Sequence, residues 1–96
     1  MSYYFMASIT IRDPAEYQKY LDRADHVFAR YKGKYLTVDD NSRVLQGTWN
    51  SERAVLIRFD SKEDFEEWYH SEDYQEILRH RLKASHGNAI LIKGRD

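Results

Sequence analysis

The chain has 96 residues, which is the size of a single domain with one modest hydrophobic core. Its 15 basic and 16 acidic residues give a net charge of −1, and like charges do not gather in blocks. A nucleic-acid binder or a protein held on an anionic membrane needs a basic face, so we expect neither partner. The absence of cysteine excludes disulfides, thiolate metal sites and a cysteine nucleophile.

The first residues, MSYYFMASITIRD, have neither the basic flank of a signal peptide nor an apolar run long enough for a membrane span. We therefore expect a cytoplasmic protein in which residues 1–96 form one domain.

Residues 3–11 alternate between two sets of side chains, which is the period of a β-strand. Asp13 and Pro14 then predict the start of a helix, with Glu16 as the partner in a capping box. Gly33 is the expected stop of this helix. Its apolar stripe has the spacing of one helical face and consists of Tyr17, Tyr20, Leu21, Ala24, Val27, Phe28 and Tyr31.

The middle of the chain predicts two further strands. Residues 34–38 form the first, residues 39–42 are typical of a turn, and residues 43–46 are expected to resume the strand. Residues 47–51 read as a loop that carries Trp49. The stretch RAVLIRF at residues 53–59 predicts a strand whose apolar middle favours a central place in a sheet.

Two helical pieces follow, separated by a break at His70 and Ser71. Ser61 is the expected N-cap of the first piece, with Asp64 as its box partner, and Ser71 is the expected N-cap of the second. We expect Gly87 to close the second piece, before a last strand over residues 89–93. The side chains predicted to be buried are Phe65, Trp68 and Tyr69 in the first piece, and Tyr74, Ile77, Leu78 and Leu82 in the second.

The resulting order, β-α-β-β-α-β, is typical of the ferredoxin-like α+β fold, with a four-stranded antiparallel sheet and helices on one face. RNA-recognition domains share this order, but their third strand needs a glycine and several aromatic residues, whereas RAVLIRFD has only Phe59. The other face of the sheet carries apolar residues that nothing left in the chain can cover. We therefore expect a homodimer that packs through this open face.

Several segments together resemble one known family: WYHSEDYQEILRHR, RAVLIRFDSKEDFEEW, HGNAILIKG, KGKYL, L-Q-G-x-W and the D-P-x-x-Y after the first strand. Over nearly its full length the chain is similar to domain of unknown function 1330 (DUF1330), in the dimeric α+β barrel superfamily. The resemblance implies a homodimer with pockets between helices and sheet, and no established reaction. Other branches of the superfamily include cofactor-free monooxygenases, isomerases of small lactones and haem proteins, and fold alone does not choose among them.

The sequence departs from the family pattern at three positions. His70 stands where asparagine is frequent, Glu72 where proline is frequent, and Lys83 where arginine is common. The last two changes are conservative in effect, whereas His70 alters the side-chain chemistry available at the helix break.

Aromatic residues concentrate around the helix break. Core packing, with each hydroxyl on a backbone carbonyl or at the surface, explains any single ring. The alternative is a stacking wall for a planar or phenolic ligand, with Tyr69 and Tyr74 converging from either side of the break. Trp49, on a loop beside glycine, is the hardest ring to explain as core, and Tyr17 completes the predicted ligand-binding set.

Arg81 lies two helical turns after Tyr74, on roughly the same face. It is either a solvated cation at a helix C-terminus or an anchor for a carboxylate ligand. His70 and Asp39 are the candidate catalytic residues, because an imidazole and a carboxylate can both move protons. The alternative for Asp39 is a turn residue.

The four histidines show no spacing typical of a metal site, so we predict no metal. We expect no cofactor, with haem as a remote alternative. The sequence therefore favours a homodimer that binds a small aromatic or carboxylate-bearing molecule, and leaves open cofactor-free catalysis. The alternative is a non-catalytic dimerisation or sensing module in which the same residues are core.

Overall fold

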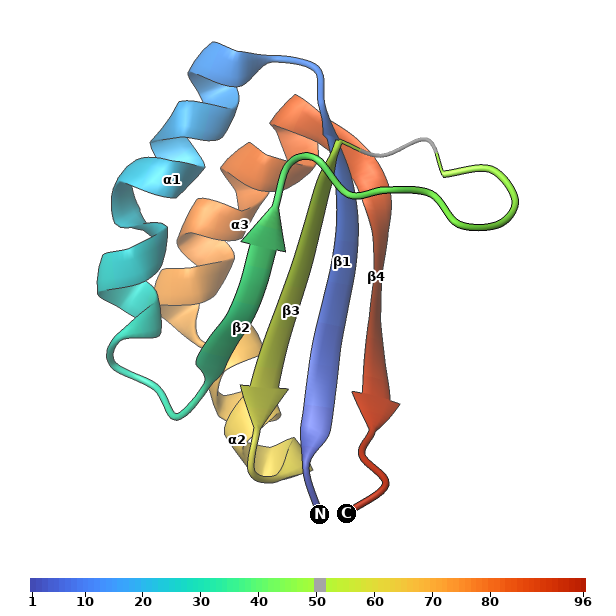
Figure 1. Ribbon diagram of the computed structural model, residues 1–96. Helices are drawn as coiled ribbons and strands as arrows, with labels where there is room; N and C mark the ends of the chain where they lie inside the picture. The colour runs from blue at the N-terminus through green and yellow to red at the C-terminus, as the bar shows by residue number, and fades with distance from the viewer. Residues whose placement is uncertain (50–51) are drawn as a thin grey trace.

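A computed structural model of the chain describes residues 1–49 and 52–96. Within these residues, four strands form one antiparallel sheet in the order β2-β3-β1-β4, and the helices lie on one side of it (Figure 1). The predicted ferredoxin-like α+β fold is confirmed, including the central place of β3. The elements are β1 (Tyr3–Ile11), α1 (Pro14–Phe28), β2 (Lys34–Asp39), β3 (Arg53–Phe59), α2 (Lys62–Tyr69), α3 (Glu72–Ala84) and β4 (Ser85–Lys93).

All three helices begin at the predicted capping residues. The backbone N–H of Glu16 donates to Asp13 Oδ1 at 3.2 Å, and that of Asp64 donates to Ser61 Oγ at 3.1 Å. Ser71 Oγ accepts from the N–H of Tyr74 at 3.2 Å, so α2 and α3 are separate helices as predicted. Each cap satisfies one of the N–H groups that a helix leaves free at its start.

The core lies between the helices and one face of the sheet. Along β1, Phe5, Ala7 and Ile9 are buried against the helices, while the alternate residues face the other way. Trp68 of α2 is 1% exposed, and its ring centroid lies 5.5 Å from that of Phe28 on α1. The second helical region of the sequence thus closes the core against the first helix and the sheet.

The opposite face of the sheet stays apolar and uncovered by the described helices. Met6 at the centre of β1 is 38% exposed, and Ile90 and Ile92 of β4 are 53% and 38% exposed. Met6 pairs with Leu56 of β3 and with Ile90, so these side chains form one continuous patch. We call the patch of Met6, Leu56, Ile90 and Ile92 the open face.

The first helix is shorter than predicted. It ends at Phe28, five residues before Gly33. A Cβ at position 33 would lie 2.6 Å from ring atoms of both Phe28 and Phe59. Gly33 is therefore required by close packing against the core and not as the helix stop that the sequence suggested.

The end of α3 was also predicted wrongly. The helix ends at Ala84, whose carbonyl accepts the N–H groups of Arg12 and Asp13 at 2.8 and 3.0 Å. Strand β4 therefore begins at Ser85 and not at residue 89. Gly87 lies inside this strand opposite Ile9, where a Cβ would come within 2.0 Å of the Ser8 carbonyl oxygen.

Two smaller predictions fail as well. Residues 43–46 form no strand, and the connection after β2 projects away from the sheet (Figure 1). Leu82 is 62% exposed and not buried. Of the predicted loop at 47–51, Asn50 and Ser51 lie outside the described residues. No described helix is long and apolar enough to cross a membrane.

Candidate functional site

A cavity of about 300 Å³ lies between the helices and the covered face of the sheet. This volume is at the lower end of the range for small-molecule sites. Apolar side chains such as Phe5, Ile57 and Trp68 form much of its wall. The polar side chains that line it are Tyr17, Tyr20, Asp25, Tyr35, Arg53, Tyr74 and Arg81.

Arg81 is the most unusual of these residues. Its side chain is buried, with 7% of the residue exposed, and its guanidinium carbon lies 5.9 Å from the ring centroid of Tyr20. Within the described residues its Nε has no hydrogen-bond partner and no carboxylate forms an ion pair with it. A buried cation without a counter-ion costs several kcal/mol, of the order of the desolvation penalty of one ion. The aromatic face of Tyr20 offsets about 1–2 kcal/mol of that cost.

Two phenols meet beside this guanidinium. The hydroxyl oxygens of Tyr20 and Tyr74 lie 3.0 Å apart, and one donates to the other. Burial raises the pKa of Tyr20 well above its usual value, and burial likewise raises the pKa of Tyr74 against the opposing effect of Arg81. Both phenols are therefore protonated at neutral pH. The pair keeps one hydroxyl hydrogen free for a further acceptor.

Trp68 adds a second buried donor without a partner. Its indole Nε1 can only donate, and no acceptor among residues 1–49 and 52–96 reaches it. Trp68 and Arg81 line the same cavity. The buried wall thus has more hydrogen-bond donors than acceptors, which suits a ligand that carries a negative charge.

Arg53 is the second cation of the cavity, and it is not among the site residues predicted from the sequence. Its Nε and Nη2 donate to the two carboxylate oxygens of Asp40 at 2.7 and 3.1 Å, and its guanidinium carbon lies 5.7 Å from the Tyr17 ring centroid. One signal was available, because Asp40 and Arg53 are opposite charges at the two ends of the same strand-to-strand connection.

Three of the predicted ligand-binding residues, Tyr17, Tyr74 and Arg81, line this cavity together. Tyr69 does not line it. Instead Tyr69 lines a smaller hollow of about 220 Å³ at the junction of α3 and β4, which also includes His86. Arg81 lines both spaces, so it lies in the wall between them.

The other predicted residues lie elsewhere. Trp49 is 46% exposed on the connection between β2 and β3 and does not line the cavity. His70 is the C-cap of α2, where its Nε2 lies 2.8 Å from Glu66, and its side chain is 64% exposed. Asp39 ends β2 and accepts the N–H of Asn41 at 2.9 Å, which is a turn contact. The described residues contain no cluster of three metal-binding side chains.

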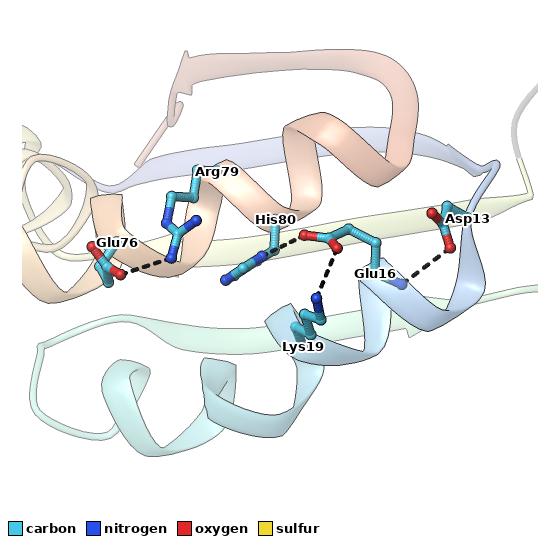
Figure 2. Close-up of polar contacts among 6 residues, drawn as sticks. All are labelled: Asp13, Glu16, Lys19, Glu76, Arg79 and His80. Atoms are coloured by element: carbon cyan, nitrogen blue, oxygen red, sulfur yellow. Dashed lines mark hydrogen bonds and ion pairs between the residues drawn. The ribbon is translucent and has the colours of Figure 1, made fainter.

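Helices α1 and α3, which cover the cavity, are joined by a polar contact on their outer side (Figure 2). Glu16 lies 2.5 Å from His80 Nδ1 and 3.1 Å from Lys19 Nζ, so its carboxylate reaches across to α3. Hydrogen bonds from His80 and Lys19 lower the pKa of Glu16 to about 2. The residue expected to complete a capping box thus links the two helices instead.

Comparison with solved structures shows the same fold at low sequence identity. The protein of unknown function RPA0582 from Rhodopseudomonas palustris is 18% identical, with a TM-score of 0.80 over 99% of this chain and 83% of that one. SnoaB, a cofactor-independent oxygenase from Streptomyces nogalater, is 18% identical, with a TM-score of 0.66 over 99% and 94%. A putative antibiotic biosynthesis monooxygenase from Nitrosomonas europaea is 10% identical, with a TM-score of 0.64 over 98% and 90%.

These likenesses confirm the ferredoxin-like α+β fold. No curated protein matches the sequence. The model of the family described as "Domain of unknown function (DUF1330)" matches residues 2–95, which is nearly the full chain. The resemblance stated from the sequence is confirmed, and the protein belongs to the DUF1330 family.

Proposed function

We propose that the protein binds a small organic anion in the cavity between α1, α3 and the sheet, and that it does so as a homodimer. The observation that carries this proposal is the buried guanidinium of Arg81, which has no counter-ion among the described residues. A ligand carboxylate would supply that counter-ion through charge-assisted hydrogen bonds, which are the strong class of hydrogen bond in proteins.

The rest of the cavity suits the body of such a ligand. Phe5, Ile57 and Trp68 offer apolar and aromatic surface, and Tyr17 and Tyr74 add ring faces with hydroxyl groups. At about 30 Å³ per water molecule in the bulk liquid, the cavity holds roughly ten waters. A single substituted aromatic ring with an acid group is of that size.

The phenols of Tyr20 and Tyr74 and the guanidinium of Arg81 also determine which reactions the cavity could support. Phenols whose pKa is raised by burial donate protons or hydrogen bonds, and a guanidinium stabilises negative charge. The only carboxylate that lines the cavity in the described part of the chain is Asp25, which is exposed. The cavity is therefore suited to stabilise an anion, and His70 and Asp39 have no part in the proposal.

Any cofactor-free reaction would be one in which negative charge develops on the bound ligand. SnoaB, a cofactor-independent oxygenase, is a precedent for catalysis without a cofactor on this fold.

The homodimer is proposed on separate grounds. The open face exposes Met6, Ile90 and Ile92 in one patch, and an apolar sheet face of this kind is stable when a second copy covers it. A symmetric pairing would leave the cavity of each subunit on the outer side of its own sheet, so each subunit would keep one site.

Calorimetric titration with benzoate tests the proposal. We expect saturable binding to the wild type and at least about tenfold weaker binding to Arg81→Met, since a charged hydrogen bond contributes roughly 1.5–3 kcal/mol. Arg79→Met is the matched control, because Arg79 lies on the same helix, pairs with Glu76 at 3.0 Å and does not line the cavity. Equal benzoate affinity in wild type and Arg81→Met would contradict the anion site, as would equal binding of neutral benzamide.

A further inference from the structure

The cavity contains two arginines, and they differ in one respect. Arg81 has no carboxylate partner among the described residues. Arg53 has one, because its Nε and Nη2 both donate to the carboxylate of Asp40. Arg53 is well covered, with a side chain 18% exposed. Asp40 is not, since 60% of its side chain is in contact with solvent.

The two arginines lie along one aromatic wall. The guanidinium carbon of Arg53 is 5.7 Å from the Tyr17 ring centroid, and the Tyr17 and Tyr20 rings are 5.7 Å apart. Arg81 follows at 5.9 Å from the Tyr20 ring. Burial raises the pKa of Tyr17, and both guanidinium groups oppose that rise, as expected for a phenol placed between two cations.

Asp40 occupies Arg53 in the way that a ligand carboxylate would. Two parallel N–H···O bonds are the arrangement that a guanidinium makes with any carboxylate. Asp40 lies on the connection after β2 with 60% of its side chain exposed, so its carboxylate can turn into water when a ligand carboxylate takes its place. Exchange of one carboxylate for another keeps both N–H···O bonds of Arg53 satisfied, and its cost is the loss of the Arg53–Asp40 contact.

From this arrangement we infer that the cavity takes a ligand with two acid groups, one bound by Arg81 and the other by Arg53 in place of Asp40. The inference rests on the proposed function, because it assumes that an anion binds at Arg81. It narrows the ligand class from organic monoanions to dicarboxylates and related dianions with a short apolar body. It also assigns Asp40 a role in specificity, since a ligand with one acid group leaves Asp40 on Arg53.

The test compares benzoate with the three benzenedicarboxylates by calorimetry, in wild type and in Asp40→Asn. In the wild type the dicarboxylate must first break the Arg53–Asp40 contact, and removal of Asp40 removes that cost. We therefore expect the best dicarboxylate to gain about tenfold in affinity relative to benzoate, the effect of one charged hydrogen-bonded contact. Asp60→Asn is the control of equal charge. Asp60 pairs with Arg58 at 2.6 Å, is 74% exposed and, like Arg58, does not line the cavity.

Arg53→Gln provides the reverse test and should abolish the preference for the dicarboxylate while benzoate still binds. The second anion position would be overturned if benzoate bound in an Arg81-dependent way and the affinity ratio stayed within twofold in both Asp40→Asn and Arg53→Gln. An equal gain in Asp40→Asn and Asp60→Asn would also overturn it, because that result reports net charge alone. If none of the four acids binds to the wild type, the proposed function is overturned as well.

Discussion

The two faces of the sheet differ in what they leave unsatisfied. The covered face, toward the helices, buries two donors, Arg81 Nε and Trp68 Nε1, that have no acceptor among the described residues. The open face leaves apolar side chains in water, with Met6 and Ile90 at 38% and 53% exposure. A missing acceptor is supplied by a small polar molecule, whereas a missing apolar cover is supplied by another surface. This difference is the reason that we propose a small ligand for the covered face and a second copy of the chain for the open face.

The largest effect is expected on the open face. Met6→Asp would place a charge at the centre of the proposed dimer contact, where desolvation of one ion costs several kcal/mol. We expect the dimer dissociation constant, measured by sedimentation equilibrium, to rise at least about a thousandfold. Ile90→Asp should act in the same direction.

Leu82→Asp is the control for that experiment. Leu82 is 62% exposed on α3, on the other side of the sheet from Met6, so the substitution adds the same charge away from the contact. A wild-type protein that sediments as a monomer, or a Met6→Asp variant that stays dimeric, would remove the homodimer from the proposal.

On the covered face, the strongest effect should come from Arg81→Met. The substitution removes a buried charge that has no carboxylate partner among residues 1–49 and 52–96, and it keeps most of the apolar stem. We therefore expect the unliganded protein to become about 1–3 kcal/mol more stable. Urea unfolding measures this directly. Arg79→Met should change stability by less than about 0.5 kcal/mol, because exposed pairs contribute little. A clear loss of stability in Arg81→Met would mean that the guanidinium is structural.

The hydrogen bond between the hydroxyls of Tyr20 and Tyr74 can be tested separately from Arg81. Tyr74→Phe leaves the Tyr20 hydroxyl buried without its partner, and we expect a loss of about 1–2 kcal/mol. The double variant Tyr20→Phe, Tyr74→Phe removes both polar groups and should recover most of that loss. If the two single losses simply add in the double variant, the hydroxyls do not interact as described.

The smallest effect concerns the outer contact of α1 with α3. The pKa of Glu16 is about 2 in the folded protein against an ordinary value of 4.5, so its contribution is complete above pH 4.5 and disappears as the pH falls toward 2. The difference in unfolding free energy between wild type and Glu16→Gln should therefore shrink to zero across that interval. A difference that stays constant from pH 5 to pH 2 would contradict the lowered pKa.

Local signals in the sequence predicted the elements well. Asp13, Ser61 and Ser71 begin the helices, because capping depends on residues three positions apart. The two errors on glycine have a common cause. Gly33 and Gly87 meet segments far away in the sequence, and a glycine required by such close approach looks the same as one that ends a helix.

The candidate site was predictable only in part. Tyr74 and Arg81 share a helical face, so their spacing was enough to bring them together. Arg53 was read as the first residue of a strand, and its place in the cavity depends on how β3 packs against α1. His70 was drawn into the predicted site by its position at the helix break, yet a C-cap residue there points to solvent.

The buried phenols of the cavity also lower the stability of the folded state at high pH. Burial raises the pKa of Tyr35 to about 12, and that of Tyr20 also lies well above its usual value of 10, so the folded chain retains protons that the unfolded chain releases near pH 10. Stability from these groups is complete below pH 10 and is lost as the pH rises toward 12. The buried phenols thereby make the folded chain sensitive to alkali, and absorbance of tyrosinate from Tyr20 and Tyr35 would appear together with unfolding.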